Sequence, residues 1–77
     1  MAYVILNEGH TYQHRSGGEY LCKGTYSIFN EFSGKLEEAA ALLERISDSY
    51  TLTAHGTRIE DNGKIHWDYS TGGHWPK

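Results

Sequence analysis

The segment 58–69 constrains the fold most, because it carries the pattern of a β-hairpin with a defined register. Asp61-Asn62-Gly63 suits a type I turn that ends at positive φ, a conformation that glycine adopts without steric penalty. This three-residue loop makes two cross-strand pairs: Glu60 with Lys64, and Ile59 with Ile65. An ion pair beside an apolar pair favours this register. A tighter type I′ turn at Asn62-Gly63 would pair Ile59 with His66, and it fits the pattern less well.

The length of 77 residues predicts a single compact domain, 1–77, with 71–77 as a short C-terminal tail. Six Tyr, two Phe and two Trp supply the apolar surface for a small core, so disorder is not expected. Cys22 is the only cysteine, which excludes an intrachain disulfide and favours a reducing compartment. The first apolar run is too short for a signal peptide or a membrane span. We therefore expect a cytoplasmic protein with no membrane association.

The chain before residue 31 predicts a first hairpin. Two β-rich stretches, roughly 2–15 and 19–30, flank the turn signal Ser16-Gly17-Gly18, with a bulge or bend at Gly24. After residue 49, Tyr50 to Ala54 alternates as another strand. The last strand runs to about residue 70 and is expected to turn three side chains inward: Ile65, Trp67 and Tyr69.

Between these hairpins the apolar period changes. Apolar residues from Phe29 to Ile46 recur at spacings of three and four, as on one stripe of an α-helix. Ser33 is a suitable N-cap, and the run 39–43 has high helix propensity. The sequence predicts a helix over residues 34–48. The expected order is β-β-α-β-β, an α+β two-layer sandwich in which one helix covers a four-stranded antiparallel sheet.

Charge is concentrated on the segment 31–48. It contains five acidic and two basic residues, so it carries the whole net charge of −3. On the predicted helix an acidic face would lie opposite the apolar stripe, and its residues would be Glu37, Glu38, Glu44 and Asp48. The plain interpretation is a solvated face that keeps the protein soluble. The functional one is a docking surface for a basic partner.

The tail contains a second candidate contact. Trp75 follows two glycines and either folds back over the sheet or serves as an interface anchor for a partner. We take Trp75, with the four acidic residues, as the candidate partner-binding set.

No metal, cofactor or catalytic residue is expected. His10 and His14 would stand about 13 Å apart on a strand, too far to bind one metal ion. Cys22 lies in an apolar strand with no sign of an activating base, and the carboxylates of Glu60 and Asp61 belong to a solvated hairpin tip. A metal-dependent or histidine-based function is the weakest hypothesis.

The leading hypothesis is a non-catalytic binding module whose partner is a protein or nucleoprotein with a basic surface. Compact acidic domains of this size are a common format for phage or mobile-element inhibitors of host defence, including anti-CRISPR proteins; size and charge alone support this analogy. The alternative is a small domain that binds single-stranded nucleic acid on its open sheet face. The residues for that role would be Arg15, Lys23, Arg58 and Lys64, with Tyr12 or Tyr20. A homodimer through an edge strand is compatible with either.

Overall fold

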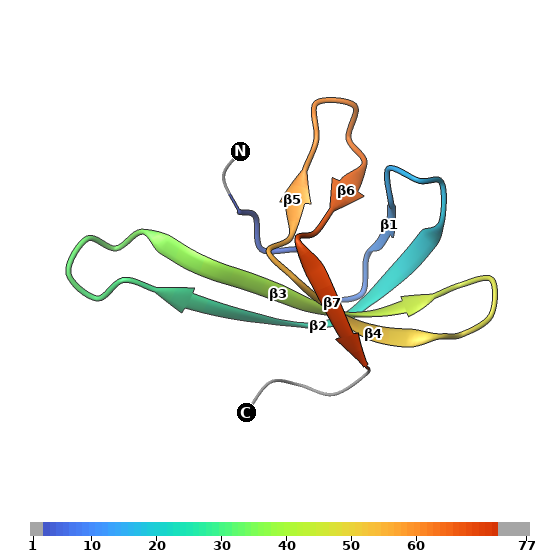
Figure 1. Cartoon of the computed structure of the whole chain (residues 1–77), viewed down its shortest axis with the longest axis horizontal. Helices are drawn as coiled ribbons and strands as arrows, with labels where there is room; N and C mark the ends of the chain where they lie inside the picture. The colour runs from blue at the N-terminus through green and yellow to red at the C-terminus, as the bar shows by residue number, and fades with distance from the viewer. Residues whose placement is uncertain (1–2, 73–77) are drawn as a thin grey trace.

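The computed structural model describes residues 3–72, and in this range the chain contains strands and no helix. Figure 1 shows a long sheet with a short two-stranded sheet beside it. The seven strands are β1 (Thr11–Gln13), β2 (Glu19–Phe29), β3 (Leu36–Arg45), β4 (Thr51–His55), β5 (Arg58–Ile59), β6 (Ile65–His66) and β7 (Tyr69–Gly72).

The main sheet is antiparallel, with the strand order β1-β2-β3-β4-β7. Strands β1 to β4 follow one another as a meander. The chain then leaves the sheet for the β5–β6 hairpin and returns to add β7 beside β4. Strands β1 and β7 are the edges of this sheet. A homodimer through an edge strand stays a prediction, and these are the two strands that it would use.

The predicted helix over 34–48, and with it the α+β sandwich, is wrong. Those residues form β3, the central strand of the sheet, paired with β2 on one side and β4 on the other. Its middle is buried from both faces: Ala39, Ala40, Ala41 and Leu43 are at most 2 % exposed. A short apolar run is compatible with a buried strand as well as with a helix, and pairing on both edges decides for the strand.

The expected helix start is a turn. Asn30 Oδ1 accepts hydrogen bonds from the backbone N–H groups of Phe32 and Ser33, at 2.9 and 2.8 Å. Ser33 Oγ accepts one from Lys35 N at 3.3 Å. Residues that cap helices also stabilise turns by the same side-chain to backbone bonds, so their presence alone does not locate a helix.

The β5–β6 hairpin confirms the predicted register. Ile59 pairs with Ile65, the backbone N–H of Glu60 bonds the carbonyl of Lys64 at 2.8 Å, and Gly63 has φ of 83°. The predicted ion pair of Glu60 with Lys64 is not the one observed: the Glu60 carboxylate is paired with Arg15 instead, at 3.4 Å. The first hairpin is confirmed in part: β1 and β2 pair around the turn 16–18, but β1 covers only Thr11–Gln13, and residues 3–10 of the predicted first strand do not form one. A register irregularity follows Cys22 next to Gly24, as predicted.

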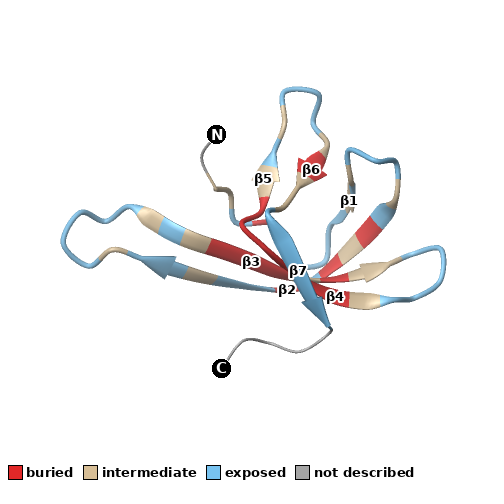
Figure 2. Ribbon diagram, viewed as in Figure 1, coloured by how far each residue is buried: buried red, intermediate tan, exposed pale blue. Residues whose placement is uncertain are grey.

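The core lies between one face of the main sheet and the β5–β6 hairpin. It comprises Leu6, Tyr20, Cys22, Ala41, Leu43, Leu52, Ala54 and Ile65, with Tyr12 and Trp67 packed against it. Figure 2 shows these buried segments in the middle of β3, in β4 and in β6. Ile65 and Trp67 therefore point inward as predicted. Tyr69 does not: it is 58 % exposed, because the chain crosses to the edge of the other sheet before Tyr69.

The opposite face of the main sheet is the open face. By strand register one side of the sheet is shared by Tyr26, Ile28, Glu38, Ala40, His55 and Tyr69. Three of them, Tyr26, Ile28 and Tyr69, are at least 36 % exposed. The far ends of β2 and β3 continue past the rest of the sheet as a two-stranded arm, residues 28–36 (Figure 1).

Candidate functional site: an acidic pocket and a basic pocket

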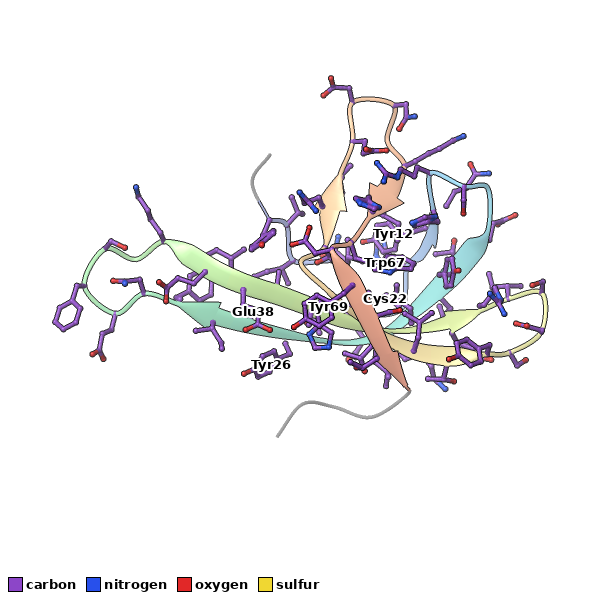
Figure 3. The ribbon with its side chains drawn as sticks, viewed as in Figure 1. Tyr12, Cys22, Tyr26, Glu38, Trp67 and Tyr69 are labelled. Atoms are coloured by element: carbon purple, nitrogen blue, oxygen red, sulfur yellow. The ribbon has the colours of Figure 1, made fainter. Side chains whose placement is uncertain are left out.

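A pocket of about 210 Å³ lies where the start of β3, the end of β4 and the start of β7 meet the N-terminal segment. We call it the acidic pocket. Its lining residues are Tyr3, Glu37, Glu38, His55, Gly56, Asp68 and Tyr69. Figure 3 shows Glu38 and Tyr69 in the same part of the sheet, with Tyr26 nearby.

His55 is the buried polar group of the acidic pocket, with only 7 % of its side chain exposed. Its ring stacks on Tyr69 with centroids 4.6 Å apart, and Nε2 lies 3.2 Å from Thr71 Oγ1. The other nitrogen, Nδ1, lies 3.6 Å from Glu38 Oε1, too far for a hydrogen bond, and has no partner within residues 3–72. A buried nitrogen without a partner is costly, so this atom indicates a place for a ligand.

Asp68 forms the far wall of the acidic pocket. Its carboxylate accepts a hydrogen bond from the Tyr3 hydroxyl at 2.9 Å and pairs with Arg58. It also packs against Gly56, where an added Cβ would lie 2.4 Å from Asp68 Oδ2. Gly56 has φ of 77° and donates its backbone N–H to the carbonyl of Ala39 at 2.8 Å. The turn at Gly56 therefore fixes how close Asp68 approaches β4.

Glu37 and Glu38 are the uncompensated charges of the acidic pocket. Glu37 occupies an irregularity in the β2–β3 register and accepts a long hydrogen bond, 3.4 Å, from Asn30 Nδ2. Within the described range, the Glu38 carboxylate lies near one ionisable group, Nδ1 of His55. Within residues 3–72, neither carboxylate is paired with a lysine or arginine.

The other two predicted acidic residues lie elsewhere. Glu44 pairs with Lys23 at 3.2 Å, and Asp48 pairs with Arg45 through two contacts of 2.6 and 2.9 Å. The hydrogen bonds from Arg45 lower the pKa of Asp48 to about 2. On a strand, Glu44 is about 20 Å from Glu38, so the four predicted carboxylates do not form one face. Trp75 lies outside the described residues.

Sequence reasoning missed His55, Asp68 and the two tyrosines of the acidic pocket. The sequence did contain one signal: His55 ends an apolar strand and precedes Gly56. A polar side chain that is buried at such a position usually has a hydrogen-bond partner, which marks it as a candidate site residue. Tyr3 and Asp68 are 65 positions apart in the chain, and no local pattern brings them together.

A second pocket, of about 190 Å³, lies beside the β5–β6 hairpin and is lined by Arg15, Arg58, Glu60 and His66. We call it the basic pocket. Two of its buried nitrogens, Arg58 Nε and His66 Nδ1, have no hydrogen-bond partner within residues 3–72. Burial lowers the pKa of His66, and the positive charges of Arg15 and Arg58 lower it further. The structure thus joins two arginines that the sequence had proposed for nucleic-acid contact.

The sequence also named Cys22 and the histidines as candidates for chemistry. The Cys22 thiol is buried and lies 3.6 Å from the carbonyl of Gly24, and burial raises its pKa. Within the described part of the chain no three His, Cys, Asp or Glu side chains are grouped closely enough to hold a metal ion.

The same residues include no helix that is long and apolar enough to cross a membrane.

Comparisons with protein-family models, with curated proteins and with solved structures find no match to this chain.

Proposed function

We propose that this chain is a non-catalytic protein-binding module that holds a lysine or arginine side chain of a basic partner in the acidic pocket. The observation that carries the proposal is the meeting of two carboxylates that have no lysine or arginine partner within residues 3–72, Glu37 and Glu38, with the buried Nδ1 of His55, which has no hydrogen-bond partner there. A cation in the pocket would compensate both carboxylates.

The pocket walls suit a cationic side chain. Carboxylates bind a guanidinium or ammonium group through charge-assisted hydrogen bonds, which are stronger than neutral ones. Tyr3 and Tyr69 supply aromatic rings, and cations bind favourably over such rings. Asp68 is already compensated by Arg58, so the carboxylates of Glu37 and Glu38, which have no lysine or arginine partner among the described residues, are the charges that would bind a cation.

The arm gives the partner an apolar contact next to the pocket. Phe32 is 91 % exposed and Phe29 is 53 % exposed, and both lie on the arm. Ile28 pairs directly with Glu38, so the base of the arm adjoins the acidic pocket. Exposed aromatic side chains are the usual anchors of protein interfaces, and the flanking charges would select the partner.

The more specific form of the proposal is an inhibitor of a host defence nucleoprotein, of phage or mobile-element origin. Nucleoproteins present basic grooves that grip phosphates, and an acidic pocket is complementary to such a groove. Small size and concentrated negative charge support this form, and the partner's identity is what the experiment must supply.

Affinity capture from a bacterial lysate, with and without nuclease, tests the proposal. The tagged protein is compared with two charge-matched variants, Glu37→Gln/Glu38→Gln and Glu44→Gln/Asp48→Asn, and bound proteins are quantified by mass spectrometry. We expect a nuclease-resistant protein partner that the second variant retains and the first loses by at least about tenfold, corresponding to about 1.4 kcal/mol.

Thermal melting of both variants controls for folding. Equal recovery of the partner by the Glu37/Glu38 variant would exclude the acidic pocket as the binding site. Loss of the partner with the Glu44/Asp48 variant alone would instead move the interface to the other end of β3.

Binding of single-stranded nucleic acid is the second candidate, favoured by the exposed rings of Tyr26 and Tyr69 on the open face. The charges on that face favour it less, because Lys23 is paired with Glu44. The expected mark of this function is an affinity that falls steeply with salt. Complexes lost on nuclease treatment in the capture experiment would support it over the protein partner.

A further inference from the structure

The basic pocket contains a second recognition chemistry that the proposed function does not use. We propose that it binds a phosphate group, held jointly by Arg15 from the β1–β2 turn, Arg58 from β5 and His66 from β6. The pocket lies on the hairpin side of the molecule, whereas Glu38, His55 and Tyr69 of the acidic pocket share the open face.

Two unsatisfied donors carry the inference. Arg58 Nε is always protonated, and it is buried without an acceptor. His66 Nδ1 is also buried without a partner, and it donates in one neutral tautomer and in the protonated ring. A buried polar group without a partner loses its hydrogen bonds to water and gains none from the protein. Both groups belong to residues that line the same pocket and are paired directly across the β5–β6 hairpin, so a ligand in this pocket is the acceptor that we propose for them.

Arg15 is placed to complete the site. Its contact with Glu60 is long, 3.4 Å, and its side chain is 51 % exposed. Exposed ion pairs of this kind contribute little to stability, so a ligand can compete for the guanidinium. Arg58 makes its contact with Asp68 through a different nitrogen, so this ion pair does not satisfy Nε.

The geometry of three donors from three separate elements favours phosphate over a carboxylate. A phosphate has at least three acceptor oxygens arranged around a tetrahedral centre and carries up to two negative charges, whereas a carboxylate has two oxygens in one plane. Glu60 and Asp68 balance the two arginines in formal charge, so a bound anion is held by the hydrogen-bond donors and must replace the long contact of Arg15 with Glu60. A volume of about 190 Å³ is below the usual range for drug-sized ligands and suits a single group.

Two kinds of ligand would present a phosphate group to this pocket. One is free phosphate or a phosphate monoester, and the other is the phosphodiester backbone of a single-stranded nucleic acid. Titration of the folded protein with inorganic phosphate, followed by NMR of the backbone and the His66 ring, tests the site directly. A parallel titration with acetate tests the preference for phosphate, and one with a short oligothymidylate distinguishes the sources.

The ring of His66 gives a signature that folding alone would not move. The groups that face it are Arg15, Arg58, Glu60 and the His14 ring, whose centroid is 5.7 Å away. Bound phosphate would offset the two arginines, so we expect the apparent pKa of His66 to rise when phosphate is added.

Three variants complete the test. Arg15→Gln and His66→Phe should each weaken phosphate binding by at least about tenfold. Lys64→Gln removes a neighbouring charge outside the pocket lining, and it should leave binding unchanged apart from a small general effect. If His66→Phe fails to fold, Arg58→Lys takes its place, because it keeps the charge and removes Nε.

Saturable binding of inorganic phosphate that depends on Arg15 would support the site, and tighter binding of the oligothymidylate through the same residue would identify a phosphodiester as the ligand. Absence of saturable shifts up to about 10 mM phosphate would overturn the proposal. Equal binding of acetate, or equal weakening by Lys64→Gln, would also overturn it, because either outcome indicates only general attraction of anions.

Discussion

Arg58 and Asp68 form an ion pair whose two members line different pockets: Arg58 the basic one and Asp68 the acidic one. The guanidinium of Arg58 also lies over the ring of Tyr3, 5.8 Å from its centroid, and the Tyr3 hydroxyl bonds Asp68. This cluster joins the N-terminal segment, β5 and the connection before β7. Because the two charges of this ion pair belong to different pockets, a change of charge in one pocket is expected to affect ligand binding in the other.

The first prediction concerns this ion pair. Asp68→Asn removes one negative charge next to Arg58 and retains an oxygen for Tyr3. If both pockets bind as proposed, the variant should bind phosphate roughly two- to fivefold more tightly, as expected for loss of a competing partly exposed ion pair. It should bind the basic partner more weakly. Phosphate titration measures the first effect, and unchanged or weaker phosphate binding would show that Asp68 does not restrain Arg58.

The second prediction concerns Gly56, the residue at positive φ next to Asp68. Gly56→Ala should destabilise the protein by about 1–3 kcal/mol, because the new Cβ strains the backbone and meets the Asp68 carboxylate. Urea unfolding gives the value. Gly72→Ala is the matched control, since its Cβ would meet nothing within 4 Å, and it should have a far smaller effect. Equal stability of the two variants would contradict the close approach of Asp68.

The third prediction tests the central strand. Leu43 is fully buried in β3, so Leu43→Ala should lower the free energy of unfolding by about 2–5 kcal/mol. Ile46, just beyond the strand, is 51 % exposed, and Ile46→Ala should cost no more than about 0.5 kcal/mol. Slow exchange of the amide protons of residues 39–43, together with a circular dichroism spectrum free of helical signal, would support the strand. A helical spectrum would refute it.

The fourth prediction is a loss of stability in mild acid. Burial lowers the pKa of both His14 and His66 in the folded protein. The charges of His66 and Arg15 lower the pKa of His14 further, and those of Arg15 and Arg58 lower the pKa of His66 further. The unfolded chain takes up protons near pH 6.5, and the folded chain does so only at lower pH. The free energy of unfolding should therefore fall as the pH drops below about 6.5 and level off below the folded pKa values. Urea midpoints between about pH 8 and pH 5 measure this.

A double variant, His14→Gln/His66→Phe, supplies the control for that pH dependence. Its basal stability can differ, but its slope between neutral and mildly acidic pH should be flatter than that of the parent. An unchanged slope would assign the acid sensitivity to other groups. The exposed Asp48 acts in a separate range, because its lowered pKa affects stability only as the pH falls from about 4 towards 2.

The fifth prediction separates the arm from the fold. Phe32 is 91 % exposed, so Phe32→Ser should leave the melting temperature almost unchanged. The same variant should recover less of the basic partner in affinity capture, because the apolar contact beside the acidic pocket is lost. Full recovery of the partner would show that the arm is outside the interface, while a large fall in melting temperature would show that the arm contributes to the core.

Where turn chemistry dominates, the sequence by itself determined the structure. The loop 61–63 has a glycine where positive φ is required, and the register it predicts for Ile59 and Ile65 is the one observed. The turn at 16–18 and the strand that became β4 follow from equally local patterns. These features rest on contacts between near neighbours in the chain, so their determinants lie within a few residues.

Only the tertiary structure decided the state of residues 36–45 and the composition of the two pockets. The helix propensities of Ala, Leu and Glu differ from those of ordinary residues by at most about 0.7 kcal/mol each, whereas full burial of a leucine such as Leu43 contributes about 1.5–3 kcal/mol. Pairing with β2 and β4 therefore outweighs local preference. The same pairing separates Glu38 from Glu44 and brings Glu38 to His55, because a site built across strands depends on register between distant segments.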